Sequence, residues 1–118
     1  MSETIDLLSQ LVAIDSVNPD LVPGAAGEGK LARFVAGWLE EAGLDVTLQE
    51  VAPGRPNVVG IVRGTGGGRS LMLNAHMDVV STAGMAGGWG PRVEGNRLFG
   101  RGAFDMKGSL AARHGRRR

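Results

Sequence analysis

The chain contains no cysteine among its 118 residues, which excludes disulfide bonds and thiolate metal ligands. This absence fits a reducing compartment. No stretch approaches the roughly 18 apolar residues of a membrane-spanning helix. The N-terminus also lacks the basic flank and apolar run of a secretory signal peptide. We therefore expect a cytoplasmic protein without a membrane partner.

Excess charge of one sign is missing from most of the chain as well. The formal net charge is +1, but Arg113, Arg116, Arg117 and Arg118 contribute +4, so subtracting them leaves −3 for residues 1–112. A body of this charge does not predict a nucleic-acid surface, and we expect no nucleic-acid partner. Glycine, in contrast, is abundant: it makes up 20 of the 118 residues, more than twice the average of about 7%. Such a composition predicts tight turns and loops that build a site.

Two segments have apolar residues at the 3.6-residue period of a helix. The first helix is expected to run from the N-terminus to about Ile14, after which Asn18 and Pro19 break the chain. The second helix is expected over residues 28–42. Gly43 follows it, at the position where a glycine commonly ends a helix.

The period then changes from 3.6 to 2, which predicts strands. Residues 44–49 alternate between apolar and polar and predict a half-buried strand. Residues 57–63 predict a second strand, and residues 70–74 a third that is apolar on both faces. The glycine-rich residues 64–68 are expected to form a turn, because a phosphate-binding loop would be followed by a helix rather than by a strand.

The last third of the chain predicts a hairpin and a helix. Gly95 and Asn96 are a favourable two-residue turn between two short apolar segments. A third helix is expected over residues 105–112. This order of helices and strands predicts an α/β fold with a mixed sheet flanked by helices.

A histidine and an aspartate follow the strand predicted over residues 70–74. In an extended chain, residues i and i+2 point to the same face, so His76 and Asp78 are expected to project together. An imidazole beside a carboxylate suits a metal site, because the carboxylate can fix the tautomer of the liganding ring. For a lone pair of this kind, a histidine satisfied at a strand end beside a helix-capping aspartate is the commoner arrangement.

A second motif changes that balance. Asp105 follows a loop in which Gly100 and Gly102 allow backbone turns that other residues resist. Alone, Asp105 would be read as a helix N-cap. Within the run Gly-Arg-Gly-Ala-Phe-Asp-Met-Lys-Gly, however, its carboxylate can bridge two divalent ions, which lie roughly 3.5–4 Å apart in two-metal hydrolytic sites.

Taken together, the two motifs resemble the signature pair of the M20 metallopeptidase family. This family includes acetylornithine deacetylases, succinyl-diaminopimelate desuccinylases and aminoacylases, and the resemblance covers roughly residues 4–112. It implies that His76 binds one zinc ion and that Asp105 bridges two. It implies further that Asp78 is catalytic by orienting His76, and the peptide bond that follows the aspartate at the position of Asp105 is often cis in the family. Zn²⁺ is the expected cofactor, two ions per complete site, with Co²⁺ or Mn²⁺ as substitutes.

The resemblance also implies a function. Members hydrolyse the amide bond of N-acyl amino acids or small peptides, so we expect a small-molecule substrate of that kind. The family's general base, its remaining metal ligands and its lid and dimerisation domain have no counterpart here, because only 13 residues follow Asp105 and none is acidic. Residues 1–112 are therefore predicted to be the incomplete N-terminal part of a zinc-peptidase-like catalytic domain. We expect the chain alone to be inactive and a homodimer to form only with the missing domain; the alternative is a non-catalytic remnant or small binding domain.

Residues 113–118 form a basic tail without an amphipathic pattern. Arginine outnumbers lysine 11 to 2, which is typical of a GC-rich gene, and our hypothesis is that the tail is the product of a shifted reading frame. An evolved nucleic-acid-binding tail is the less supported alternative. His114 is a poor candidate for the family's late histidine ligand. Arg101 and Lys107 are expected to be solvated or to brace the loop.

Overall fold

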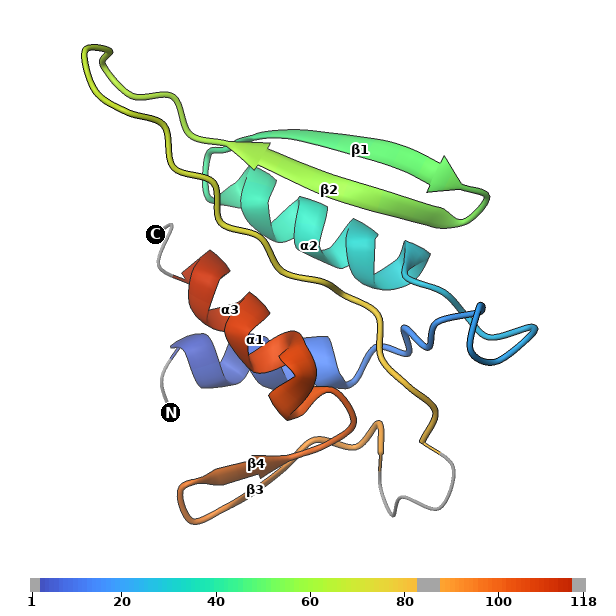
Figure 1. The fold of residues 1–118 in the computed structure, drawn as a ribbon. Helices are drawn as coiled ribbons and strands as arrows, with labels where there is room; N and C mark the ends of the chain where they lie inside the picture. The colour runs from blue at the N-terminus through green and yellow to red at the C-terminus, as the bar shows by residue number, and fades with distance from the viewer. Residues whose placement is uncertain (1–2, 83–87, 116–118) are drawn as a thin grey trace.

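The structure is a computed structural model that describes residues 3–82 and 88–115, with side chains as far as Ala112. It contains three α-helices, one π-helical turn and four strands (Figure 1). In chain order these are α1 (Glu3–Val12), α2 (Gly29–Glu41), β1 (Asp45–Ala52), β2 (Arg55–Ile61), β3 (Arg92–Glu94), β4 (Arg97–Phe99), η1 (Ala103–Lys107) and α3 (Gly108–Gly115).

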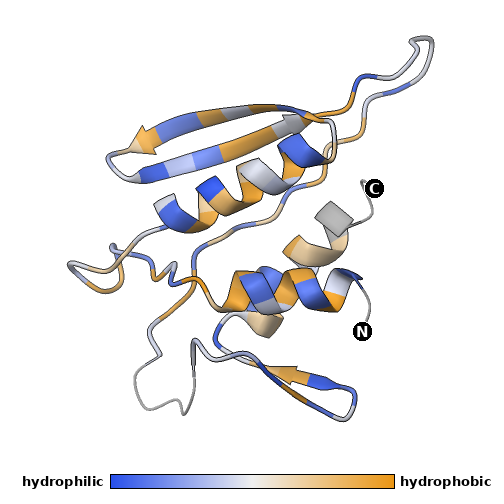
Figure 2. Ribbon diagram, turned by 180° about the vertical axis from the view of Figure 1, so that it is seen from behind, coloured by the Kyte–Doolittle hydropathy of each residue, from blue (hydrophilic) through white to orange (hydrophobic). Residues whose placement is uncertain are grey.

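The core lies where the apolar faces of the three α-helices meet. α1 packs against α3, and α2 packs against the β1–β2 hairpin. Figure 2 shows polar and apolar residues alternating along α1 and α2, as expected of amphipathic helices. Each leucine buried in this way stabilises the fold by about 1.5–3 kcal/mol relative to an exposed one. The buried cluster consists of Leu7, Leu8, Leu11, Val12, Leu31, Val35, Leu39, Leu44, Leu110 and Ala111.

Both predicted N-terminal helices are confirmed within a few residues. α2 ends as the sequence predicted, because Gly43 has a left-handed φ of +91°. Its N–H donates to the carbonyl of Glu40, and the N–H of Leu44 donates to the carbonyl of Leu39. These two bonds satisfy carbonyls that the end of a helix leaves unpaired.

The strands form two separate antiparallel hairpins. β1 pairs with β2, with Asp45 opposite Ile61 and an irregularity near Glu50. β3 pairs with β4, with Glu94 opposite Arg97. The predicted two-residue turn at positions 95 and 96 is therefore confirmed, as are the strands on both sides of it.

The prediction of a third strand over residues 70–74 is wrong. This segment is an extended, unpaired trace between α2 and α3 (Figures 1 and 2). Leu71 is 81% exposed and Met72 is 84% exposed. A strand that is apolar on both faces needs a neighbouring strand and a covering layer on each side, and the described part of the chain supplies neither. The predicted mixed sheet is therefore not formed by the described residues, whose strands make two separate hairpins. Their parallel pairing is limited to an isolated bridge between Val17 and Val79.

The third helix begins later than predicted. Asp105 and Met106 have non-helical backbone angles, and α3 begins at Gly108. Asp105 is therefore not the N-cap of this helix, the simpler of its two interpretations. The peptide bond between Asp105 and Met106 is cis, in agreement with the resemblance. α3 extends to Gly115, so it includes the first backbone positions of the basic tail, whereas residues 116–118 lie outside the described residues.

A buried lysine joins η1 to the end of α1. Lys107 is fully buried, and its Nζ donates to the carbonyls of Leu11 (2.8 Å) and Ile14 (2.9 Å). Its ammonium also lies 5.5 Å from the centre of the Trp89 ring, within cation–π range. Lys107 therefore braces the loop, which is one of the two roles expected from the sequence. It is not solvated, which was the other. Burial lowers the pKa of Lys107 to about 8, and the charge of Asp15 opposes this shift.

Two glycines let the chain pass closely over the core. A Cβ on Gly100 would lie 2.3 Å from Cγ1 of Val12. A Cβ on Gly102, which has a φ of +83°, would lie 2.5 Å from Cγ1 of Val79. Both distances are far below van der Waals contact. None of the helices in the described ranges has the length and apolar character needed to cross a membrane.

We expect Gly100→Ala to destabilise the chain by about 1–3 kcal/mol, because its methyl group overpacks the buried Val12. Gly37→Ala is the matched control. Gly37 lies within α2, and apart from its chain neighbours and the backbone of its own helix, no atom lies within 4 Å of the place that its new methyl group would occupy. The change should therefore stabilise by about 0.5–1 kcal/mol. Urea denaturation measures both. A neutral Gly100→Ala would contradict the close approach of the loop to α1.

Lys107 predicts a pH dependence of stability. Because its pKa is lowered from 10.5 to about 8 in the folded chain, the unfolded chain holds more protons between these two values. The free energy of unfolding should therefore rise with pH from about 8 to about 10.5, by up to about 3 kcal/mol at 1.36 kcal/mol per pKa unit. Urea denaturation at pH 7.5, 9 and 10.5 measures this rise.

Lys107→Met is the control for that experiment and should abolish the rise. Few other side chains titrate in this pH range, because the chain has no cysteine or tyrosine and Lys30 is its other lysine. Equal pH slopes in the wild type and in Lys107→Met would show that the buried ammonium does not carry the effect.

Candidate metal centre

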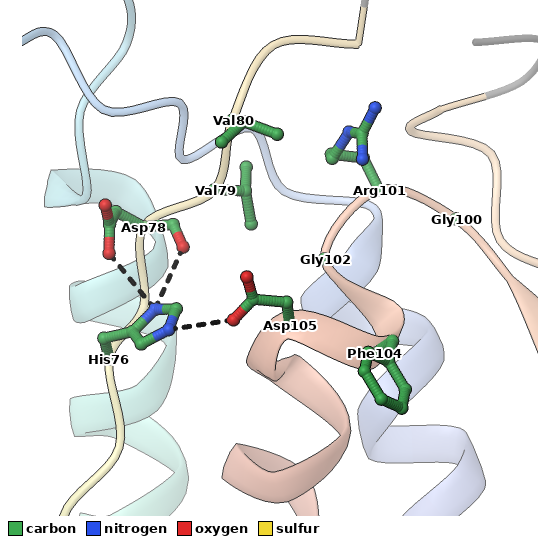
Figure 3. Close-up of a pocket in the computed structure, with 9 residues that line it drawn as sticks. All are labelled: His76, Asp78, Val79, Val80, Gly100, Arg101, Gly102, Phe104 and Asp105. Carbon is green, nitrogen blue, oxygen red and sulfur yellow. Dashed lines mark hydrogen bonds and ion pairs between the residues drawn. The ribbon is translucent and has the colours of Figure 1, made fainter. Parts of the chain in front are cut away.

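The three predicted site residues lie around one cavity of about 570 Å³ (Figure 3). His76 and Asp78 come from the extended segment that follows residues 70–74, and Asp105 comes from η1. The cavity is lined by His76, Asp78, Val79, Val80, Gly100, Arg101, Gly102, Phe104 and Asp105. The two sequence motifs thus meet at a single place in the fold.

The imidazole of His76 lies between the two carboxylates. Its Nε2 is 3.1 Å from Oδ1 of Asp105. Its Nδ1 is 3.1 Å from Oδ1 of Asp78 and 3.2 Å from the carbonyl oxygen of the same residue. The predicted projection of His76 and Asp78 to the same side is therefore observed.

These contacts bear on the tautomer of His76 in a metal-bound site. Acceptor oxygens face both ring nitrogens, two of Asp78 at Nδ1 and Oδ1 of Asp105 at Nε2. With a metal ion between Nε2 and Asp105, Nδ1 would carry the hydrogen and donate it to Asp78, and the lone pair of Nε2 would point toward the ion. This is the tautomer that a histidine needs in order to bind a metal ion through Nε2.

The distance between Nε2 of His76 and Oδ1 of Asp105 fits two ligands of one ion. With bonds of about 2.0–2.2 Å and tetrahedral angles, two such atoms on zinc lie roughly 3.3–3.6 Å apart, close to the observed 3.1 Å. Imidazole nitrogen and carboxylate oxygen are also donors that zinc, cobalt and manganese accept. The pair therefore fits a divalent metal ion in both chemistry and spacing.

The described residues supply only part of a metal site. No group of three or more histidine, aspartate or glutamate side chains that could hold an ion is found among them. The carboxylate of Asp78 lies on the Nδ1 side of the ring, away from Asp105, so two donors converge rather than three. The side chain of His114 lies outside the described residues.

The cavity is open rather than enclosed. The side chains of His76 and Asp105 are 49% and 80% exposed, whereas that of Asp78 is 28% exposed. Phe104, next to Asp105, is 98% exposed. A ligand can reach Nε2 of His76 and the Asp105 carboxylate directly, while Asp78 is held further from solvent.

Asn18 contacts the site, which the sequence did not reveal. Its Nδ2 donates to Oδ2 of Asp78 at 2.8 Å. Asn18 precedes a proline, and in the sequence it signalled only a break in the chain. No pattern links it to Asp78, because the two residues are 60 positions apart and their contact depends on how the segments fold together.

A second charged group near the site is already paired. Arg55 lines a neighbouring cavity of about 350 Å³ that His76 and Asp78 also border. Its guanidinium binds Glu28 through two hydrogen bonds, of 2.9 and 3.0 Å, and Asp20 through one of 3.0 Å. The bond to Glu28 is the main cause of a raised pKa for Arg55. Arg55 is therefore engaged in holding β2 to the start of α2 rather than free for a ligand.

Comparisons with known proteins match the part of the chain that contains these residues. Residues 72–114, which include all three site residues, match the model of peptidase family M20/M25/M40. The chain is 35% identical over 115 residues to N-formyl-4-amino-5-aminomethyl-2-methylpyrimidine deformylase from Bacillus subtilis, covering 92% of this chain and 26% of the relative. It is 37% identical over 117 residues to succinyl-diaminopimelate desuccinylase from Methylocella silvestris, covering 92% and 28%.

A third relative is acetylornithine deacetylase from Vibrio atlanticus, 29% identical over 110 residues, with 91% of this chain and 29% of the relative covered. The chain thus spans about a quarter of the length of the curated relatives that it matches. The family model covers both motifs, and the relatives match nearly the whole chain. The chain therefore belongs to peptidase family M20/M25/M40.

Proposed function

We propose that this chain supplies a histidine and a bridging carboxylate to the divalent-metal site of a hydrolase that cleaves amide bonds. The observation that carries the proposal is the approach of His76 Nε2 to Asp105 Oδ1 at 3.1 Å, within two motifs of the family. An unrelated pair of surface residues would not need the tautomer of the histidine to be set by a second carboxylate, that of Asp78.

The names of the relatives indicate the class of substrate. They describe a deformylase, a desuccinylase and a deacetylase, and a carboxypeptidase G2 from Pseudomonas is also 34% identical. We infer that the substrates are N-acyl amino acids or small peptides, in which a short acyl group is joined to an amine. The names differ in the acyl group, so the class rather than one compound is proposed.

Each site residue has a distinct proposed role. His76 binds a metal ion through Nε2, and Asp105 binds through its carboxylate, which is exposed enough to reach two ions. Asp78 accepts the Nδ1 hydrogen and so keeps Nε2 free to bind. A divalent ion, which we propose to be zinc, polarises the scissile carbonyl and makes water acidic enough to be a nucleophile near neutral pH.

We propose further that the chain alone does not catalyse. Its two converging donors are fewer than the three protein ligands usual at a catalytic zinc. The cavity lining contains two carboxylates, Asp78 and Asp105, and both have roles at His76 or at the metal. No carboxylate in that lining is left to accept the proton of the attacking water. By itself the chain is then a weak metal-binding segment, which is the non-catalytic alternative.

Zinc affinity tests the ligand roles. Competition with a chromophoric chelator should show that wild type binds Zn²⁺ weakly and that His76→Ala and Asp105→Asn abolish this binding. Asp78→Asn should weaken it by about 10- to 100-fold, because it removes the acceptor that orients His76. Asp45→Asn is the control, since this exposed carboxylate lies in β1 and pairs with Arg63. Equal affinities in wild type and His76→Ala would contradict the proposal.

Hydrolysis is tested separately. With excess Zn²⁺, we expect the purified chain to release no acyl group from N-formyl, N-acetyl or N-succinyl amino acids above the rate without protein. The physical reason is that the described residues give the cavity no third ligand and no free base. Turnover that depends on zinc and disappears in His76→Ala would show that the chain is catalytic by itself.

A further inference from the structure

We propose that Asn18 is a positioning residue of the metal centre, which holds Asp78 in the orientation that directs His76 Nε2 toward the metal. This inference rests on the proposed function, because it concerns the same site. It adds a residue from the loop after α1 that belongs to neither metal-binding motif. A continuous series of contacts leads from Asn18 to Asp78, from Asp78 to His76, and from His76 to Asp105.

The orientation of the Asn18 amide follows from its two partners. Its Oδ1 accepts a hydrogen bond from the backbone N–H of Asp20 at 2.8 Å. A backbone N–H can only donate, so the atom facing it must be the oxygen. The other atom, Nδ2, therefore faces Oδ2 of Asp78 at 2.8 Å and donates to it. Both ends of the amide are engaged, which leaves a single orientation.

Asp78 is held through both of its oxygens. Oδ2 accepts from Asn18, and Oδ1 lies 3.1 Å from Nδ1 of His76. Without the Asn18 donor, the carboxylate would be free to rotate about its χ2 torsion, a broad and soft one for aspartate. The tautomer and direction of the His76 ring would then be less well defined. A charged acceptor with a fixed donor behind it is the arrangement that orients liganding histidines.

The backbone around Asn18 is fixed independently of its side chain. The N–H of Asn18 donates to the carbonyl of Val79 at 3.0 Å, and the N–H of Val79 donates to the carbonyl of Ser16 at 3.1 Å. Ser16 is fully buried, and its Oγ donates to the carbonyl of Met77 at 2.8 Å. A change of the Asn18 side chain should therefore leave the segment in place and alter only the contact with Asp78.

These contacts also provide a matched control. Ser16 and Asn18 lie in the same loop, and each side chain bonds to the segment of residues 77–79. Ser16 bonds to backbone, however, whereas Asn18 bonds to the Asp78 carboxylate. Ser16→Ala removes a buried structural hydrogen bond without touching the site, and Asn18→Ala removes a contact with the site.

The experiment compares wild type, Asn18→Ala, Asn18→Asp and Ser16→Ala by zinc affinity, by thermal melting and by ¹⁵N NMR of the His76 ring in the metal-free chain. Asn18→Asp keeps an acceptor for the Asp20 N–H but replaces the donor toward Asp78 with a like charge. We expect zinc affinity to fall about 3- to 10-fold in Asn18→Ala, below the 10- to 100-fold of a direct partner of a ligand. It should fall further in Asn18→Asp and stay within about twofold of wild type in Ser16→Ala.

The NMR measurement does not depend on zinc. It is made in an Asp105→Ala background, where Nε2 no longer faces a carboxylate. At pH 8.5, where an imidazole is ordinarily neutral, the ring should then show hydrogen on Nδ1, and the added change Asn18→Ala or Asn18→Asp should weaken this preference. Unchanged ring signals and unchanged zinc affinity in Asn18→Ala would overturn the proposal. An equal loss of affinity in Ser16→Ala would also overturn it, because the role would then be one of general stability.

The same design separates the two proposals. If wild type and His76→Ala bind zinc equally, the proposed metal site fails. The ring signals of the metal-free chain then still decide whether Asn18 orients His76: a changed tautomer supports the positioning role, and an unchanged one refutes it.

Discussion

The contact between the buried ammonium of Lys107 and the end of α1 determines where η1 lies. The last four carbonyls of a helix have no partner within it, and Lys107 Nζ donates to the carbonyl of Leu11, in the last turn of α1, and to that of Ile14, just beyond it. Burying a lysine is unfavourable unless its hydrogens are paired, so this position strongly favours one placement of the loop. Asp105, two residues earlier, is carried with it to the mouth of the cavity.

The segment just after α1 is also what holds the first motif. Ser16 and Asn18 bond to residues 77–79 through backbone and side chains. α1 and the turn that follows it therefore contact both motifs, one through Lys107 and the other through this short parallel pairing. This explains how residues 29 positions apart, His76 and Asp105, come to lie 3.1 Å from each other although no sheet in the described ranges joins them.

The sequence predicted those parts of the fold that depend on local chemistry. α1 and α2 follow from a 3.6-residue apolar period, the end of α2 from Gly43, and the β3–β4 hairpin from a two-residue turn that favours glycine and asparagine. The segment at residues 70–74 was predicted wrongly, because its apolar pattern specifies that it should be covered but not what covers it.

The same distinction between local chemistry and long-range packing applies to the candidate site. His76, Asp78 and Asp105 were selected from residue type and spacing, and the structure brings them together. Asn18 and the burial of Lys107 could not be predicted, because their partners lie 60 and more than 90 positions away and are reached only through packing. Their spacing to those partners in the chain carries no signal.

X-ray absorption at the zinc edge of the zinc-loaded chain tests the central claim most directly, because it identifies the atoms bound to the ion. The chain has two histidines, His76 and His114, so the wild type and His76→Ala should be compared. The account predicts one imidazole with oxygen ligands in the wild type, and loss of the imidazole signal in His76→Ala. An imidazole signal that persists in His76→Ala, or is missing from the wild type, would contradict the assignment of His76 as the metal ligand.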